Sequence, residues 1–110
     1  EGIGRPRVEP SFIRELVDRM VVVDNVDSVA AMRALSALLG RKVGPSTGTN
    51  FTAMLMLAHE MRARGERGAI LSLLCDAGER YLPTYHDDAW VRDQLGDCAA
   101  AHERLSALAA

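Results

Sequence analysis

The stretch V-G-P-S-T-G-T-N at residues 43–50 decides how the chain is interpreted. Gly44 and Gly48 permit sharp backbone turns and the close approach of a ligand. We expect a tight polar loop here, followed by a helix that begins at about Thr49. The first amides of a helix have no partner within it, so such a place can bind an anion or the polar edge of a heterocycle. The same residues are also typical of a simple N-cap, in which Thr49 or Asn50 only caps the helix.

Apolar residues on both sides of this stretch recur at three- and four-residue spacing, which predicts two helices with one buried face each. The stripes are Val29, Met32, Leu35, Leu38 and Leu39 before the loop, and Phe51, Met54, Leu55, Ala58 and Met61 after it. Asp27 and Ser28 offer cap oxygens to the first helix. Gly40 is expected to end it in the left-handed conformation. The second helix should end near Arg64.

Two apolar runs, residues 20–23 and 69–74, predict short buried strands. A helix capped by Asp87 or Asp88 and a helical tail from Cys98 onward follow in the sequence. The order of strand, helix, loop, helix, strand and helix predicts α/β layering with a partly parallel sheet. Two or three strands would leave long unpaired edges, so we expect the missing strands to come from elsewhere.

Composition restricts the class of protein. The chain has 110 residues, 48% of them hydrophobic, and a formal net charge of −2, which is typical of one globular domain. The absence of a basic excess disfavours a nucleic-acid binder, and no apolar run approaches the roughly 20 residues that span a bilayer. Cys75 and Cys98 are too few and too widely spaced for a disulfide framework or a zinc ribbon, which favours reduced thiols in a cytosolic protein. Because the sequence opens with Glu1, we expect a piece of a longer chain.

Other chemical motifs have simpler interpretations. His59-Glu60 would need a second histidine at position 63 for a metalloprotease site, and Ala63 stands there. The three histidines are far apart in sequence, so we expect no metal site. The pair Asp87-Asp88 could serve acid–base chemistry, but helix capping is the better explanation. Trp90 is expected to be a packing anchor.

Several motifs together resemble a known family. They are E-G-I-G at residues 1–4, V-G-P-S-T-G-T-N at 43–50, A-I-L-S-L-L-C-D-A-G-E-R-Y at 69–81 and T-Y-H-D-D-A-W-V at 84–91. In order and spacing they resemble the C-terminal part of the cysteine synthase and cystathionine β-synthase family, fold-type II enzymes that use pyridoxal 5′-phosphate. The G-R-P-R-V-E-P-S-F stretch near the start looks closest to bacterial cysteine desulfhydrase and cysteine synthase-like proteins. The resemblance covers about residues 1–91. It implies an incomplete three-layer open sheet with helices on both faces, and makes residues 1–110 the C-terminal segment of the enzyme domain.

The resemblance also implies cofactor-binding residues. Ser46, in the G-x-S-x-G pattern, would meet the pyridine nitrogen of pyridoxal 5′-phosphate. A neutral hydroxyl leaves that nitrogen essentially unprotonated, which suits β-elimination and β-replacement. Gly2 and Gly4 would line the site with backbone groups. Asp76 would lie close behind the pyridine edge, after Cys75, which stands where the family often has proline.

No catalytic residue is expected in the chain. The family's Schiff-base lysine, phosphate loop and substrate-carboxylate loop lie N-terminal to the matched segment, and Lys42, the sole lysine, does not match the family lysine. The resemblance implies a cytoplasmic, homodimeric lyase or transferase acting on cysteine or an O-activated serine, with the missing N-terminal part supplied by a parent enzyme. The alternative is a non-catalytic α/β scaffold or dimerisation module derived from the same family.

Overall fold

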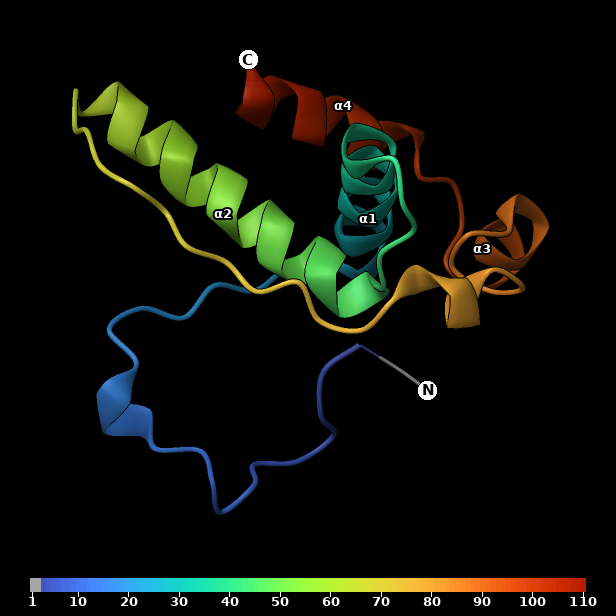
Figure 1. Ribbon diagram of the computed structural model, residues 1–110, viewed down its shortest axis with the longest axis horizontal. Coiled ribbons are helices and arrows are strands. Elements are labelled where there is room, and N and C mark those ends of the chain that lie inside the picture. Colours follow the sequence, from blue (N-terminus) through green and yellow to red (C-terminus); the bar gives the residue numbers. More distant parts are fainter. Residues whose placement is uncertain (1–2) are drawn as a thin grey trace.

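The computed structural model describes residues 3–110, and its regular elements in that range are all helical (Figure 1). They are the short 3₁₀ helix η1 (Arg14–Leu16), α1 (Asn25–Leu39), α2 (Pro45–Ala63), the 3₁₀ helix η2 (Gly78–Tyr81), α3 (Asp88–Gln94) and α4 (Ala99–Ala109). The helices α1 and α2 pack against each other, and α4 contacts both. No helix among the described residues is long and apolar enough to cross a membrane.

The contact between α1 and α2 is close and partly polar. Gly48 has no side chain, and a Cβ there would lie 2.0 Å from the carbonyl oxygen of Ser28. The hydroxyls of Ser28 and Thr49 are 2.7 Å apart and share a hydrogen bond. Thr52 donates from Oγ1 to the carbonyl oxygens of Gly48 and Asp27 at 3.0 and 3.3 Å. The bond to Gly48 lies within α2, whereas the bonds to Ser28 and Asp27 join the two helices and help to fix how α2 packs on α1.

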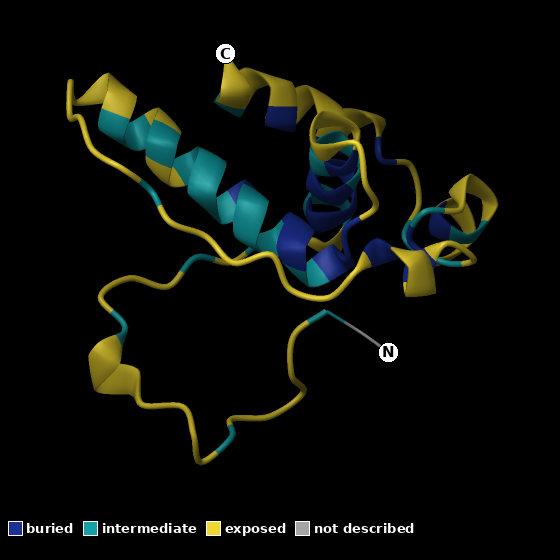
Figure 2. Cartoon of the chain, in the orientation of Figure 1, coloured by how far each residue is buried: buried dark blue, intermediate teal, exposed yellow. Residues whose placement is uncertain are grey.

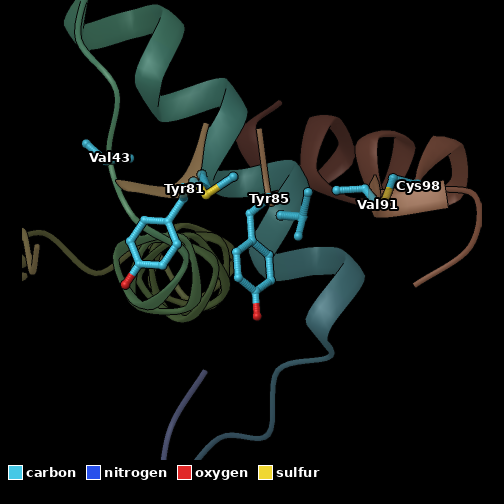
Figure 3. Packing of buried hydrophobic residues seen from close by; sticks show 7 residues of the cluster. Val43, Tyr81, Tyr85, Val91 and Cys98 are labelled. Carbon is cyan, nitrogen blue, oxygen red and sulfur yellow. The ribbon is translucent and has the colours of Figure 1, made fainter. Parts of the chain in front are cut away.

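A small apolar core joins α1 to the segments that follow α2. Figure 3 shows this cluster, which consists of Val29, Met32, Val43, Tyr81, Tyr85, Val91 and Cys98. The rings of Tyr81 and Tyr85 meet edge to face with centroids 5.7 Å apart, and Trp90 approaches Tyr85 at 4.9 Å. Figure 2 shows the buried residues gathered in α1 and at the start of α2. Trp90 is therefore a packing residue, as predicted.

Several helix ends were predicted correctly. Gly40 follows α1 with a φ of 67°, in the left-handed region. Asp87 caps α3, because its carboxylate accepts a hydrogen bond from the Trp90 amide at 2.7 Å. The tail forms α4 from Ala99. The expected start of α2 at Thr49 was wrong: the helix begins at Pro45, since proline suits the first turn, where an amide partner is not required.

The predicted strands and open sheet are not formed by the described residues. Residues 20–23 and 69–74 lie outside any helix or strand, and the backbone pairing present is an isolated antiparallel bridge between Val43 and Ala77. No backbone hydrogen bond joins residues 20–23 or 67–72 to another described residue. A strand needs a neighbour to satisfy its amides and carbonyls, and these two segments do not pair with each other. The described residues therefore form helices and an isolated bridge, and the predicted α/β layering is not confirmed by them.

The N-terminal part, from residue 3 to the start of α1, forms a wide loop to one side of the helices (Figure 1). Most of it is exposed (Figure 2). Arg19 fastens it to α2 through two hydrogen bonds to the Glu60 carboxylate, at 2.5 and 2.8 Å. Ile3, at the start of the described chain, packs against the core cluster.

Replacing Gly48 with alanine tests the close helix contact. The new Cβ would also lie 2.8 Å from Met32 Cβ, so α2 must move away from α1. We expect the free energy of unfolding to fall by about 1–3 kcal/mol, although alanine is the better helix former by about 1 kcal/mol. Urea unfolding followed by circular dichroism measures it. Gly68→Ala is the control, because its Cβ would meet only Met61 Cε at 3.6 Å. Equal effects at both positions would contradict the interpretation.

Candidate functional site

The entrance of α2 brings the G-x-S-x-G residues into the first helical turn. Gly44 is the N-cap and Pro45 the first helical residue, so Ser46 and Thr47 belong to the helix rather than to a preceding loop. Ser46 is half-buried, and its hydroxyl forms no hydrogen bond with any group that the structure describes. Thr47 is buried and accepts a hydrogen bond from the amide of Cys75 at 2.9 Å. Of these two neighbouring hydroxyls, that of Ser46 is open to a ligand.

The segment before η2 wraps around this entrance. The amide of Gly44 donates to the carbonyl oxygen of Asp76 at 3.2 Å, and that of Gly78 donates to the carbonyl oxygen of Lys42 at 3.1 Å. A Cβ on Gly44 would lie 2.7 Å from Asp76 Oδ1, and one on Gly78 would lie 2.5 Å from Val43 N. Gly78 is therefore required by close backbone contact, and Gly44 is favoured by the close side chains of Asp76 and Tyr81. The motifs at residues 43–50 and 69–81 meet in one place.

Asp76 lies beside the entrance with a fixed carboxylate. The Tyr81 hydroxyl donates to Asp76 Oδ2 at 2.5 Å, and an Arg80 guanidinium nitrogen lies 3.7 Å from the same oxygen. The carboxylate thus orients η2 against the entrance, and Gly44 packs beneath it. The side chain is exposed enough to border a ligand.

The two N-terminal glycines are less closely placed. Gly2 lies outside the described residues. Gly4 is exposed, has a φ of 80°, and would have no atom near an added Cβ. Its neighbour Ile3 packs against the core cluster that contains Val43 and Tyr81. The structure therefore places Asp76 beside the helix start that contains Ser46, and an added Cβ on Gly4 would contact neither residue.

Sequence reasoning missed two residues that support the entrance. Ser36 Oγ accepts a hydrogen bond from the amide of Val43 at 3.1 Å and donates to the carbonyl oxygen of Met32 at 2.7 Å. His86 Nε2 donates to the carbonyl oxygen of Val43 at 3.0 Å, since a carbonyl can only accept. Both peptide groups of Val43 are thereby fixed. Burial lowers the pKa of His86, against a smaller raising effect of this hydrogen bond. The only sequence signal for His86 was its position in the T-Y-H-D-D motif.

The remaining candidates have structural roles. Asp88 pairs with Arg33 at 2.5 Å, while Asp87 caps α3, so the two carboxylates do not act as a pair. Cys75 is exposed and Cys98 buried, both as free thiols, and burial raises the pKa of Cys98. Within residues 3–110 no group of three metal-ligating side chains gathers.

Several known proteins match most of this chain in sequence. The L-cysteine desulfhydrase of Mycobacterium tuberculosis is 55% identical over 107 residues, which cover 94% of this chain and 29% of that protein. The chain is homologous to the C-terminal part of cysteine synthase-like enzymes. A cysteine synthase of Aquifex aeolicus is 33% identical over 78 residues, 70% of this chain and 24% of that enzyme. A Caenorhabditis elegans protein named as pyridoxal-phosphate dependent is 36% identical over 85 residues, 74% of this chain and 19% of that protein. No family model and no solved structure matches the chain.

The extent of these matches defines what is shared. The chain spans less than a third of each cysteine synthase-like relative and matches about their C-terminal quarter. The desulfhydrase match covers 94% of the chain, so it extends beyond residue 91 into the tail, where the sequence motifs gave no resemblance. The helix α4 is therefore part of the homologous region.

His86→Gln tests the support of the entrance through pH dependence. Because burial lowers the pKa of His86 in the folded chain below its ordinary 6.5, the unfolded chain takes up the proton first as the pH falls. The free energy of unfolding of the wild type should therefore decrease below about pH 6.5. Glutamine keeps an N–H donor for Val43 but does not titrate, so this part of the decrease should vanish. Urea unfolding between about pH 8 and pH 5 measures it.

The exposed histidine of α4, His102, provides the matched control. His102→Gln should retain the wild-type decrease in stability at low pH. If His86→Gln and His102→Gln have the same pH dependence, protonation of His86 is not coupled to folding.

Proposed function

We propose that the chain forms the pyridine-ring side of the cofactor site in a pyridoxal-phosphate-dependent enzyme of cysteine metabolism. The enzyme would catalyse β-elimination or β-replacement, as a cysteine desulfhydrase or cysteine synthase does, with cysteine or an O-activated serine as substrate. The observation that carries the proposal is the uncommitted hydroxyl of Ser46 at the entrance of α2, in a chain 55% identical to a cysteine desulfhydrase.

Ser46 suits the ring nitrogen of the cofactor. Pyridoxal 5′-phosphate supplies an electron sink for reactions at the substrate's β-carbon. A hydroxyl can donate a hydrogen bond to an unprotonated pyridine nitrogen. Because the hydroxyl is neutral, it adds no negative charge that would favour protonation of that nitrogen. Thr47 and Asn50 form hydrogen bonds of 2.9 and 3.2 Å with the backbone of Cys75 and Leu73. These bonds hold the segment next to Ser46 in place. The role of Ser46 is to hold the ring in place.

The other cofactor-binding assignments form part of the same proposal. Asp76 would border the ring edge, with its carboxylate held by Tyr81. Gly4 would line the site with backbone groups, which its left-handed conformation and lack of a side chain allow. Gly2 is assigned the same role on the resemblance alone.

The rest of the site is proposed to come from outside this chain. Residues 1–110 would be the C-terminal segment of the enzyme domain, and the parent enzyme would supply the Schiff-base lysine, the phosphate loop and the substrate-carboxylate loop. Its strands would pair with residues 20–23 and 69–74 and complete an open sheet with helices on both faces. Leu71 is 96% exposed and Val22 88% exposed, as expected of strand residues that lack their covering layer. We further propose that the complete enzyme is a cytoplasmic homodimer.

The second candidate is a non-catalytic scaffold or dimerisation module. The exposed apolar side chains in residues 20–23 and 69–74 favour it, because large apolar patches mark interaction surfaces. The visible spectrum and intact mass of the purified protein, before and after borohydride, separate the two functions. Colourless material with no lysine-bearing partner would favour the scaffold.

Substitution of Ser46 tests the cofactor assignment in the complete enzyme. Ser46→Ala removes one hydrogen bond to the ring and should weaken cofactor binding by about 1–3 kcal/mol, with lower turnover. Equilibrium dialysis against pyridoxal 5′-phosphate, read by cofactor fluorescence, measures the affinity. Ser46→Thr keeps the hydroxyl and is the matched control, while circular dichroism checks the fold. Wild-type affinity and rate in Ser46→Ala would refute the assignment.

Leu71 tests the proposed sheet. In the chain alone this side chain is almost fully exposed, so Leu71→Ala should change the free energy of unfolding by less than about 0.5 kcal/mol. In the complete enzyme, where the strand would be covered, the same change should lower the free energy of unfolding by about 2–5 kcal/mol. Urea unfolding of both forms gives the comparison. An equally small effect in the complete enzyme would show that no strand covers this segment.

A further inference from the structure

A basic cavity of about 300 Å³ lies at the C-terminal end of α1, next to but distinct from the Ser46 entrance. Its lining includes the cations Arg33, Arg41 and Lys42, together with Ser36, His86 and Gly40. None of the carboxylates in residues 3–110 lines it. The chain as a whole carries a formal net charge of −2, so this concentration of positive charge runs against the average of the molecule.

Two of the three cations have no carboxylate partner among the described residues. Arg41 and Lys42 are exposed and form no ion pair with any carboxylate that the structure describes. They follow Gly40, whose left-handed conformation turns the chain away from the helix axis. Two adjacent charges without counter-ions repel each other, and a bound anion would relieve this repulsion.

Arg33 is held in a defined orientation. Its Nε and Nη2 donate to the carbonyl oxygen of Tyr85 at 3.2 and 3.1 Å, and its Nη1 donates to Asp88 at 2.5 Å. Because a guanidinium has five N–H donors, these bonds leave donors for a further acceptor. A guanidinium that is already oriented loses less conformational freedom when it binds an oxyanion.

The partial negative charge at the C-terminus of α1 opposes an anion here. It amounts to about half an elementary charge and is spread over the last carbonyls. The amides of Gly40 and Arg41 both donate to the carbonyl oxygen of Ser36, which satisfies part of this end. Three full positive charges, one of them paired with Asp88, outweigh the remainder.

We propose that this cavity binds a small tetrahedral oxyanion, phosphate or sulfate, either free or as the terminal group of a phosphate ester. Arg41 and Lys42 supply the unpaired charge, and Arg33 supplies oriented N–H donors. The site does not depend on the proposed function of Ser46, because every residue in it is present in the described chain.

The oxyanion site shares two residues with the hydrogen bonds that hold Val43 in front of α2. Ser36 and His86 line the cavity, and they hold the amide and the carbonyl of Val43 respectively. Val43 leads directly into Gly44 and the first turn of α2. An anion beside His86 would favour its protonated form, which still donates to the carbonyl oxygen of Val43. Binding of the anion should therefore be stronger at lower pH and should strengthen the hold on Val43.

Calorimetric titration with sodium sulfate at constant ionic strength tests the proposal, since sulfate keeps its charge of −2 across the pH range used. We expect sulfate to bind, and the double variant Arg41→Ala, Lys42→Ala to weaken binding at least about tenfold. The matched control is Arg67→Ala, Arg92→Ala, which removes two exposed arginines outside the cavity. It should retain affinity within about twofold. No binding by the wild type, or equal losses in both double variants, would overturn the proposal.

The pH dependence provides a second measurement. The charged groups that affect His86 are Lys42 and Arg33, which lower its pKa, and Glu79, which raises it, while burial lowers it most. A histidine NMR titration should give a higher pKa for His86 in sulfate than in chloride of equal ionic strength, and sulfate affinity should rise as the pH falls. His86→Gln should bind sulfate with little pH dependence. An unchanged pKa of His86 in sulfate would contradict the site.

Glycerol phosphate distinguishes the two sources of the oxyanion. Tighter binding of the ester than of inorganic phosphate would identify an organic phosphate as the ligand. Tighter binding of inorganic phosphate would identify the free ion.

Discussion

The close approach of α1 and α2 at Gly48 is the constraint on which the rest of the structure depends. A side chain at this position would collide with the backbone of α1 at Ser28, so the helices reach this distance only with glycine. The hydroxyls of Thr49 and Thr52 then find specific acceptors or donors on α1. Sliding α2 along α1 would break these bonds between the helices and leave Thr49 and Thr52 only their bonds to Pro45 and Gly48 within α2. The first turn of α2 is placed by this interface rather than by its own cap.

Near this helix contact, some hydroxyls form hydrogen bonds within the protein, and the hydroxyl of Ser46 forms none with the described residues. Thr49 is used within the helix contact, and Thr47 holds the amide of Cys75. Val43, just before the entrance, is bonded on its amide by Ser36 and on its carbonyl by His86. Ser46 stands among these committed groups with no described partner. A free polar group whose neighbours are held in place can form a hydrogen bond whose geometry is set before a ligand binds, which is what the proposed contact with the cofactor ring would need.

The sequence predicts the local features better than the long-range ones. Apolar spacing locates α1 and α2, and Gly40 and Asp87 mark helix boundaries correctly, because each of these signals acts within one or two turns. The motif of residues 43–50 contains the first turn of α2. It does not indicate which of its hydroxyls is free, since the partners of Thr47 and Thr49 lie 28 and 21 residues away. Long-range contacts of this kind depend on the fold and leave no periodic pattern.

The described residues do not form the predicted strands, for a reason that is itself informative. Residues 69–74 have the apolar character of a covered strand, and strand formation requires a partner that these residues do not find. They still run beside α2 (Figure 1), because Asn50 of that helix binds the carbonyl oxygen of Leu73 and Thr47 binds the next segment at Cys75. Val21, in the other predicted strand, lines the same cavity of about 460 Å³ over α2 as residues 70–73 do. Both segments therefore lie against α2, although neither forms a strand. The helical layer positions the segments, and it is the pairing of their backbones that a layered fold would still have to provide.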